Sequence, residues 1–149
     1  MRKAPLLLAV LGLTGSLWAA DLHVGTWKMN TEKSKFGGSQ PLKSDIVKFE
    51  ELENGIKLTS EFITADGITR HDEFTAKYDG KDYPRPKGTI SFIKIDAYTF
   101  DQVMKEDGKV VATAREVISK DGKTITRTIK WKDEKGQDLT TSIVVYEKQ

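Results

Sequence analysis

Closely spaced turn dipeptides are the feature of this 149-residue chain that most limits its fold. Six occur after residue 50, at Asn54-Gly55, Asp66-Gly67, Asp79-Gly80, Asp107-Gly108, Asp121-Gly122 and Lys135-Gly136. Five of the six are Asn-Gly or Asp-Gly pairs, which tolerate the positive φ angles that tight hairpin turns need. Each pair is therefore a candidate reversal between two neighbouring antiparallel strands.

The segments between these turns have the residue pattern of strands. In one of them, Ile125, Ile129 and Trp131 alternate with polar residues, so that one face is apolar and the other polar. After residue 20 no segment repeats apolar residues with a helical period, and the best helical candidate, 31–35, allows barely one turn. The predicted strands lie near 24–30, 44–53, 56–65, 68–78, 89–96, 98–106, 109–119, 124–133 and 138–147, with a possible short strand at 81–83.

Nine or ten strands in hairpin order predict an all-β fold with little helix, namely an antiparallel up-and-down meander barrel. A meander removes its two exposed edges most simply by closing on itself. A two-sheet sandwich is the alternative, although its crossing connections need longer loops than these two-residue turns. Pro84 and Pro86 cannot donate to a ladder, so they mark a rim loop or a gap between strands.

Residues 1–20 have the pattern of a cleavable secretory signal peptide. Two basic residues precede an apolar run, and small residues end the segment. The apolar stretch of about 15 residues is shorter than the ~20 that a membrane-spanning helix needs. We expect cleavage after Ala19 or Ala20, a single β-barrel domain over residues 21–149, and a periplasmic or secreted location.

Charge and cysteine content argue against several classes of partner. The chain has 24 basic and 22 acidic residues, and Arg2 and Lys3 of the leader account for the whole excess. The mature chain is therefore close to neutral and lacks the basic surface that nucleic acids or anionic bilayers attract. It has no cysteine to form a disulfide or to carry a lipid anchor. We expect no nucleic-acid partner and no membrane anchor, and the oligomeric state is left open.

Short motifs near both ends of the mature chain carry a family resemblance. They are Gly25-Thr26-Trp27, Ala114-Arg115-Glu116-Val117 with Asp121-Gly122-Lys123, and Tyr146-Glu147-Lys148. The first resembles the Gly-x-Trp strand that opens lipocalins and the related fatty-acid-binding proteins. The second and third resemble the Arg-Glu hairpin and the closing strand of fatty-acid-binding proteins. The Trp-Lys-x-Asn start and Ser34-Lys35-Phe36 are also similar to uncharacterised exported bacterial lipocalin-like proteins.

This resemblance implies a barrel that binds a small hydrophobic or amphiphilic molecule. It implies that Trp27 closes one end of the barrel, and that Arg115 and Tyr146 belong to a polar group at the base of a cavity. Two features depart from the fatty-acid-binding proteins. Residues 31–43 are too few for their two portal helices, and Val144 stands where their carboxylate-binding motif has an arginine.

Arg127 is the most unusual candidate because it shares a strand face with Ile125, Ile129 and Trp131. A guanidinium on the apolar face is costly unless it is paired or stacked on a ring. Stacking on Trp27 and recognition of an anion are both open. Aromatic rings supply the apolar lining of small-molecule sites, and a barrel of nine or ten strands is wide enough to leave a cavity. The candidate ligand-binding residues are Arg115, Arg127, Tyr146, Trp131, Phe62 and Phe92.

Residues for catalysis or metal binding are sparse. His23 and His71, the only two histidines, have no ligand-spaced carboxylates, so we predict no metal site. The sequence has no cysteine nucleophile, no Gly-x-Ser-x-Gly elbow and no glycine-rich phosphate loop, so we predict no catalytic residue and no cofactor.

Three function classes remain open. The first is a carrier or scavenger of a small hydrophobic or amphiphilic molecule. The second is a non-enzymatic interaction or inhibitor module that acts through the rim loops 31–43 and 80–88. The third is an enzyme on the same scaffold, which needs a polar cluster buried in the cavity. Arg70 and Asp72, on one strand face, are expected to pair as structural or rim charges.

Overall fold

A computed structural model describes residues 21–149, so the predicted leader lies outside the described residues. Within this range the secondary structure is entirely β, with ten strands and no helix. The strands are β1 (Gly25–Lys35), β2 (Leu42–Leu52), β3 (Gly55–Thr64), β4 (Thr69–Lys77), β5 (Tyr83–Pro84), β6 (Thr89–Lys94), β7 (Thr99–Glu106), β8 (Lys109–Ile118), β9 (Thr124–Trp131) and β10 (Ser142–Lys148).

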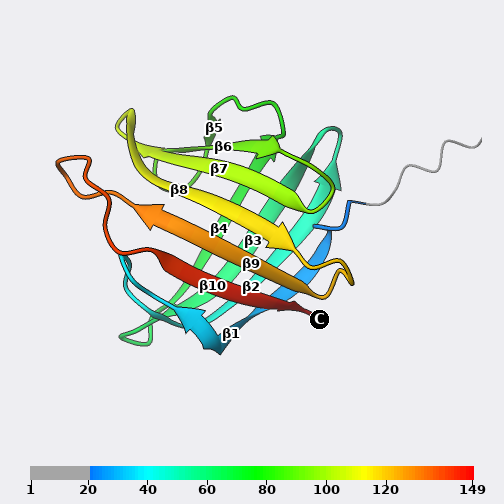
Figure 1. Cartoon of the computed structure of the whole chain (residues 1–149), viewed down its shortest axis with the longest axis horizontal. Helices are drawn as coiled ribbons and strands as arrows, with labels where there is room; N and C mark the ends of the chain where they lie inside the picture. The colour runs from blue at the N-terminus through cyan, green and yellow to red at the C-terminus, as the bar shows by residue number, and fades with distance from the viewer. Residues whose placement is uncertain (1–20) are drawn as a thin grey trace, which may run out of the picture.

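All ten strands belong to one antiparallel sheet, in the order β4-β3-β2-β1-β10-β9-β8-β7-β6-β5. Each strand pairs with its neighbour in the chain except β4 with β5, and β1 pairs with β10 to bring the two ends of the domain together. The sheet curls into a nearly closed barrel, with β7 to β10 in front and β2 to β4 behind (Figure 1). The prediction of an up-and-down meander barrel is confirmed.

The turn dipeptides set the register of these hairpins. Asp107 and Gly108 both have positive φ, at 48° and 75°, which is the pattern of a two-residue type I′ turn. They connect Glu106 directly to its partner Lys109. This turn sets the pairing where β8 begins, and an extra residue, Val111, then shifts the register between Lys105 and Met104, so that the buried residues of β8 are Ala112 and every second residue after it.

The open seam of the barrel lies between β4 and the short β5. Here Asp79-Gly80 does not turn a hairpin but leads across to β6, where Asp79 bridges Ile93. The Gly80 N–H donates to the Phe92 carbonyl at 3.0 Å. Pro84 lies in β5, at the edge of the sheet, where its missing N–H removes no ladder bond.

Two predicted segments have different bounds in the structure. Residues 31–35 continue β1 instead of forming a helical turn, and the register shift between Asn30 and Lys35 lets this strand bend along β10. The predicted rim loop 31–43 therefore shrinks to residues 36–41. Strand β10 begins at Ser142, since residues 138–141 belong to the connection from β9.

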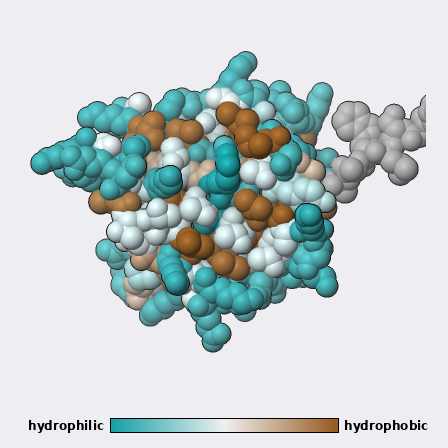
Figure 2. Space-filling view, in the orientation of Figure 1, coloured by the Kyte–Doolittle hydropathy of each residue, from teal (hydrophilic) through white to brown (hydrophobic). Residues whose placement is uncertain are grey.

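Hydrophobic side chains line the inner side of the barrel. Phe92, Phe100 and Ile56 are fully buried, and burying a side chain of this size stabilises the fold by roughly 1.5–3 kcal/mol. The outer face of the front strands is mostly hydrophilic, with separate hydrophobic groups between polar side chains (Figure 2). The inner face of the meander is thus the core, as the alternation of the strands requires.

The N-terminal segment fills one end of the barrel. His23 is fully buried, with its ring stacked between those of Phe49 and Phe100 at centroid distances of 3.8 and 4.5 Å. Its carbonyl oxygen accepts a hydrogen bond of 2.9 Å from Trp27 Nε1. We refer to residues 21–24 as the N-terminal plug, because they close the barrel below the interior.

Trp27 is fully buried beside the plug, which agrees with its expected place at one end of the barrel. The cation over its ring is Lys148, whose Nζ lies 5.4 Å from the centroid. The predicted stacking of Arg127 on Trp27 is therefore wrong, and Arg127 has other partners in the interior. Asp21 of the plug accepts a hydrogen bond of 2.7 Å from the hydroxyl of Tyr78, the residue that follows β4.

We predict that His23→Ala lowers the free energy of unfolding by about 3–5 kcal/mol, measured by urea unfolding of the full domain. The substitution empties the space between two rings and removes the Nε2 that lies 2.7 Å from Glu116 Oε2. His71→Ala is the matched control because the His71 side chain is 67% exposed, and it should change stability by less than about 0.5 kcal/mol. Equal losses in the two variants would contradict the role of the plug.

Candidate ligand-binding cavity

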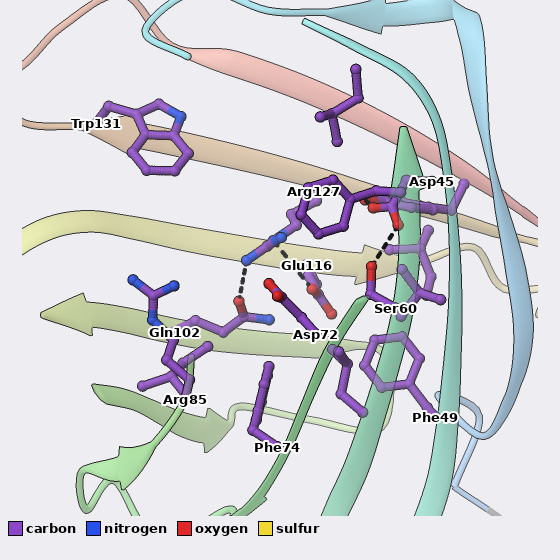
Figure 3. A pocket seen from close by; sticks show the side chains of 17 residues that line it. Asp45, Phe49, Ser60, Asp72, Phe74, Arg85, Gln102, Glu116, Arg127 and Trp131 are labelled. Carbon is purple, nitrogen blue, oxygen red and sulfur yellow. Dashed lines mark hydrogen bonds and ion pairs between the residues drawn. The ribbon is translucent and has the colours of Figure 1, made fainter. Parts of the chain in front are cut away.

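The barrel interior is hollow between the plug and the opposite rim. The cavity has a volume of about 260 Å³ and draws its lining from strands on both sides of the barrel. At about 30 Å³ for each water molecule, this space holds roughly nine water molecules or as many non-hydrogen atoms of a ligand. Aromatic walls come from Phe62 and from Phe49, Phe74 and Trp131, the last three of which are labelled in Figure 3.

Arg127 of β9 and Glu116 of β8 are cross-strand partners and form an ion pair inside the barrel. Arg127 Nη2 donates to Gln102 Oε1 at 2.7 Å, and Arg127 Nε lies 3.3 Å from Glu116 Oε1 (Figure 3). The other carboxylate oxygen of Glu116 contacts His23 Nε2 at 2.7 Å. Burial alone would raise the pKa of Glu116, but His23 and Arg127 outweigh it and hold this pKa below its usual value.

Asp45 of β2 occupies the opposite side of the cavity and has only neutral hydrogen-bond donors. Its two oxygens accept bonds of 2.7 Å from the hydroxyl groups of Ser60 and Tyr146. Burial raises the pKa of Asp45, although these bonds and the charge of Arg127 oppose the shift. Burial and the charge of Asp45 also raise the pKa of Tyr146, so the phenol keeps the proton that it donates.

Asp72 of β4 is half-buried and lines the cavity near this network. Figure 3 draws no hydrogen bond or ion pair between Asp72 and the other lining residues. The predicted pair with Arg70 is wrong, because Arg70 is exposed and no ion pair joins the two within residues 21–149. Within residues 21–149, the Asp72 carboxylate thus faces the cavity without a hydrogen bond or an ion pair.

Arg85 reaches the cavity from the turn between β5 and β6. The Arg85 N–H donates to the Gly88 carbonyl at 3.1 Å, and Gly88 has a φ of 78°. A Cβ atom at Gly88 would lie 1.9 Å from the Lys105 carbonyl oxygen, so the turn requires glycine. Burial lowers the pKa of Arg85, and the carboxylate of Glu106, 3.6 Å away, partly offsets this effect.

The structure brings together four of the six predicted site residues: Arg127, Tyr146, Trp131 and Phe62. Trp131 Nε1 is buried without a hydrogen-bond partner. The expectation that Arg115 reaches the cavity is wrong, since its side chain is 58% exposed and binds Asp101 on the outer face through two hydrogen bonds of 2.7 Å. Phe92 is fully buried in the core and does not line the cavity.

The acidic members of the cavity escaped the sequence analysis. The available signal was the alternation of each strand: Asp45 precedes Val47 and Phe49 on one face of β2, and all three are buried. In the same way, Asp72 shares a face of β4 with Phe74. A carboxylate in phase with buried hydrophobic residues is thus the pattern that marks this cavity.

Comparison with known proteins gives little beyond the fold. No protein-family model and no curated protein matches the chain. A solved structure of the siderocalin Ex-FABP, which functions through dual ligand specificities, is similar over 86% of this chain and 71% of that one, with 13% identity and a TM-score of 0.43. At this level the likeness carries no argument about a ligand, and the barrel rests on the strand pairing itself.

Residues 21–149 contain neither a candidate membrane-spanning helix nor a candidate metal-binding cluster. No helix there is long and apolar enough to cross a membrane. No group of three or more histidine, aspartate or glutamate side chains in that range is placed to hold a metal ion.

Asp45 and Glu116 should affect stability with opposite dependence on pH. The folded-state pKa of Asp45 lies above 3.8, so its contribution to stability is full below that pH and is lost as the pH rises through the folded-state pKa. The pKa of Glu116 lies below 4.5, so its contribution is full above that pH and is lost as the pH falls through the folded-state pKa.

We therefore predict that Asp45→Asn gains stability relative to the parent as the pH rises from about 4 to 7. The deficit of Glu116→Gln should be largest near pH 7 and shrink in acid. Urea unfolding at a series of pH values measures both trends. Parallel trends in the two variants would contradict the assigned pKa shifts.

Proposed function

We propose that this chain is an exported, lipocalin-like carrier or scavenger that holds a small amphiphilic molecule inside its barrel. The observation that carries the proposal is the cavity of about 260 Å³, which combines aromatic walls with charged groups. Small-molecule sites are typically apolar cavities with a few placed polar groups. Since the plug closes one end, a molecule would enter from the opposite rim or through the seam between β4 and β5.

The size of the cavity limits the ligand. Drug-sized ligands occupy pockets of about 300–1,000 Å³. The cavity lies just below this range at about 260 Å³, so a molecule of roughly nine non-hydrogen atoms is the appropriate scale. Its apolar part would contact Phe62, Phe74 and Trp131, and its polar part would meet the charged residues that line the same cavity.

The distribution of exposed hydrophobic residues favours this proposal over an interaction module at the rim. Such a module needs an apolar patch on the loops 31–43 or 80–88. In the described chain the exposed large hydrophobic residues lie outside both ranges, for instance at Ile93, Ile95 and Tyr98.

The pairing of the interior polar groups favours binding over catalysis. An enzyme needs groups that are free to exchange protons with a substrate or to attack it. Here Glu116 is shared by His23 and Arg127, and Asp45 already accepts two hydrogen bonds. Asp72 is the exception, and a single carboxylate suits recognition of a ligand.

Filling the cavity tests the proposed function. Leu58 lines the cavity, so Leu58→Trp should abolish the binding of octanol, a neutral amphiphile of suitable size, in isothermal titration calorimetry. Leu52→Trp adds the same ring to a residue that is 43% exposed and should leave binding unchanged. Equal octanol affinity in both variants, or no octanol binding by the parent protein, would contradict the proposal.

Export is tested by the mass of the mature protein. When the full chain is produced in a bacterium with secretory machinery, we predict a periplasmic or secreted product that begins at Ala20 or Asp21. Intact-mass spectrometry of the purified protein measures this. A product that stays in the cytoplasm with residues 1–20 attached would contradict export but would leave the binding proposal standing.

A further inference from the structure

The two arginines of the cavity are already neutralised. Arg127 is paired with Glu116 and donates to Gln102, as its position on the apolar face demands. Arg85 lies 3.6 Å from Glu106, and its Nε donates to the Thr89 carbonyl at 3.3 Å. Each guanidinium therefore already faces a carboxylate, although Arg127 Nε is buried without a hydrogen-bond partner.

Two carboxylates of the cavity form no direct ion pair within residues 21–149, although the charge of Arg127 acts on Asp45 and the charge of Asp72 acts on Arg85. Asp45 has two hydroxyl donors, from Ser60 and Tyr146, but no basic side chain within 4.0 Å among residues 21–149. Asp72 has neither a hydroxyl donor nor a basic partner in that part of the chain. The charge of Asp72 contributes to the raised pKa of Asp45, after burial as the main cause, so the two carboxylates influence each other.

We propose that the cavity selects a small cationic amphiphile, a protonated amine with an apolar tail, over an anionic one. This inference rests on the proposed ligand-binding function and adds the charge of the ligand. The ammonium group would lie between Asp72 and Asp45 and would give each carboxylate a direct cationic partner. The tail would extend along Phe62, Phe74 and Trp131, which border the same cavity.

An anionic ligand such as a fatty acid meets the opposite environment. Its carboxylate would approach Asp72 and Asp45, and like charges in a poorly solvated space repel each other. The cations that could offset this repulsion already face carboxylates, since Arg85 lies near Glu106, Arg127 pairs with Glu116, and Arg115 binds Asp101 on the outer face. Trp131 Nε1, one of the buried donors without a hydrogen-bond partner, is neutral and suits an uncharged oxygen atom.

Three probes with the same eight-carbon chain test this inference. Isothermal titration calorimetry of the full domain near pH 7 compares octylamine, octanol and octanoate. Octylamine should bind at least about tenfold more tightly than octanol, since a charge-assisted hydrogen bond is about twice as strong as a neutral one, and octanoate should bind most weakly. Octanoate affinity equal to or above that of octylamine would overturn the charge preference.

The neutral probe separates the two proposals. If octanol binds and octylamine binds no better, the charge inference fails and the proposed function stands. If none of the three probes binds, both fail.

Two neighbouring residues of β4 supply a matched pair of variants. Asp72→Asn removes the charge that faces the cavity and should lower octylamine affinity about tenfold more than it changes octanol affinity. Glu73→Gln removes an outer charge, 60% exposed and paired with Lys57, and should change neither affinity. Unchanged octylamine affinity in Asp72→Asn would overturn the assignment. If Asp72→Asn folds poorly, the octylamine affinity of Asp45→Asn tests the same assignment, because this variant also removes a carboxylate from the cavity.

Discussion

A buried carboxylate, that of Glu116, joins the two halves of the barrel interior. One of its oxygens contacts His23 in the plug, and the other lies 3.3 Å from Arg127 in the cavity. Removing either partner would leave a charge uncompensated in a poorly solvated place, which is far more costly than losing an exposed ion pair. The position of the plug, and the orientation of Arg127 toward Gln102, both depend on this group. Glu116 thus lies between the plug and the cavity, in contact with a residue of each.

Local sequence was sufficient to predict the architecture. The turn at Asp107-Gly108 and the alternation of Ile125, Ile129 and Trp131 depend on neighbouring residues only, so both could be interpreted without knowing the fold. The same is true of Trp131 and Arg127, which share one face of a single strand and line the cavity together. Residues 31–35 escaped prediction because their place in β1 depends on pairing with β10, more than 100 residues away.

The interior of β8 shows why the site was only partly predictable. Ala114 and Glu116 point inward, whereas Arg115 between them points outward to Asp101. Hydrophobic residues lie on both faces of this strand, so its own pattern does not decide which face is inside. The register with β9 places Glu116 opposite Arg127, and this pairing shows which face of β8 is inside. For Glu116 the partner on the neighbouring strand, rather than the hydrophobic pattern of β8, is therefore the feature that marks it as a cavity residue.

The central claim is that the hollow between the plug and the rim is where a ligand binds. Intermolecular nuclear Overhauser effects between octanol and the methyl groups of the protein test it most directly. We predict contacts to Leu58, Ile90 and Ile125, which line the cavity. Contacts confined to Ile93 and Ile95 on the outer surface, with none to the lining methyl groups, would contradict it.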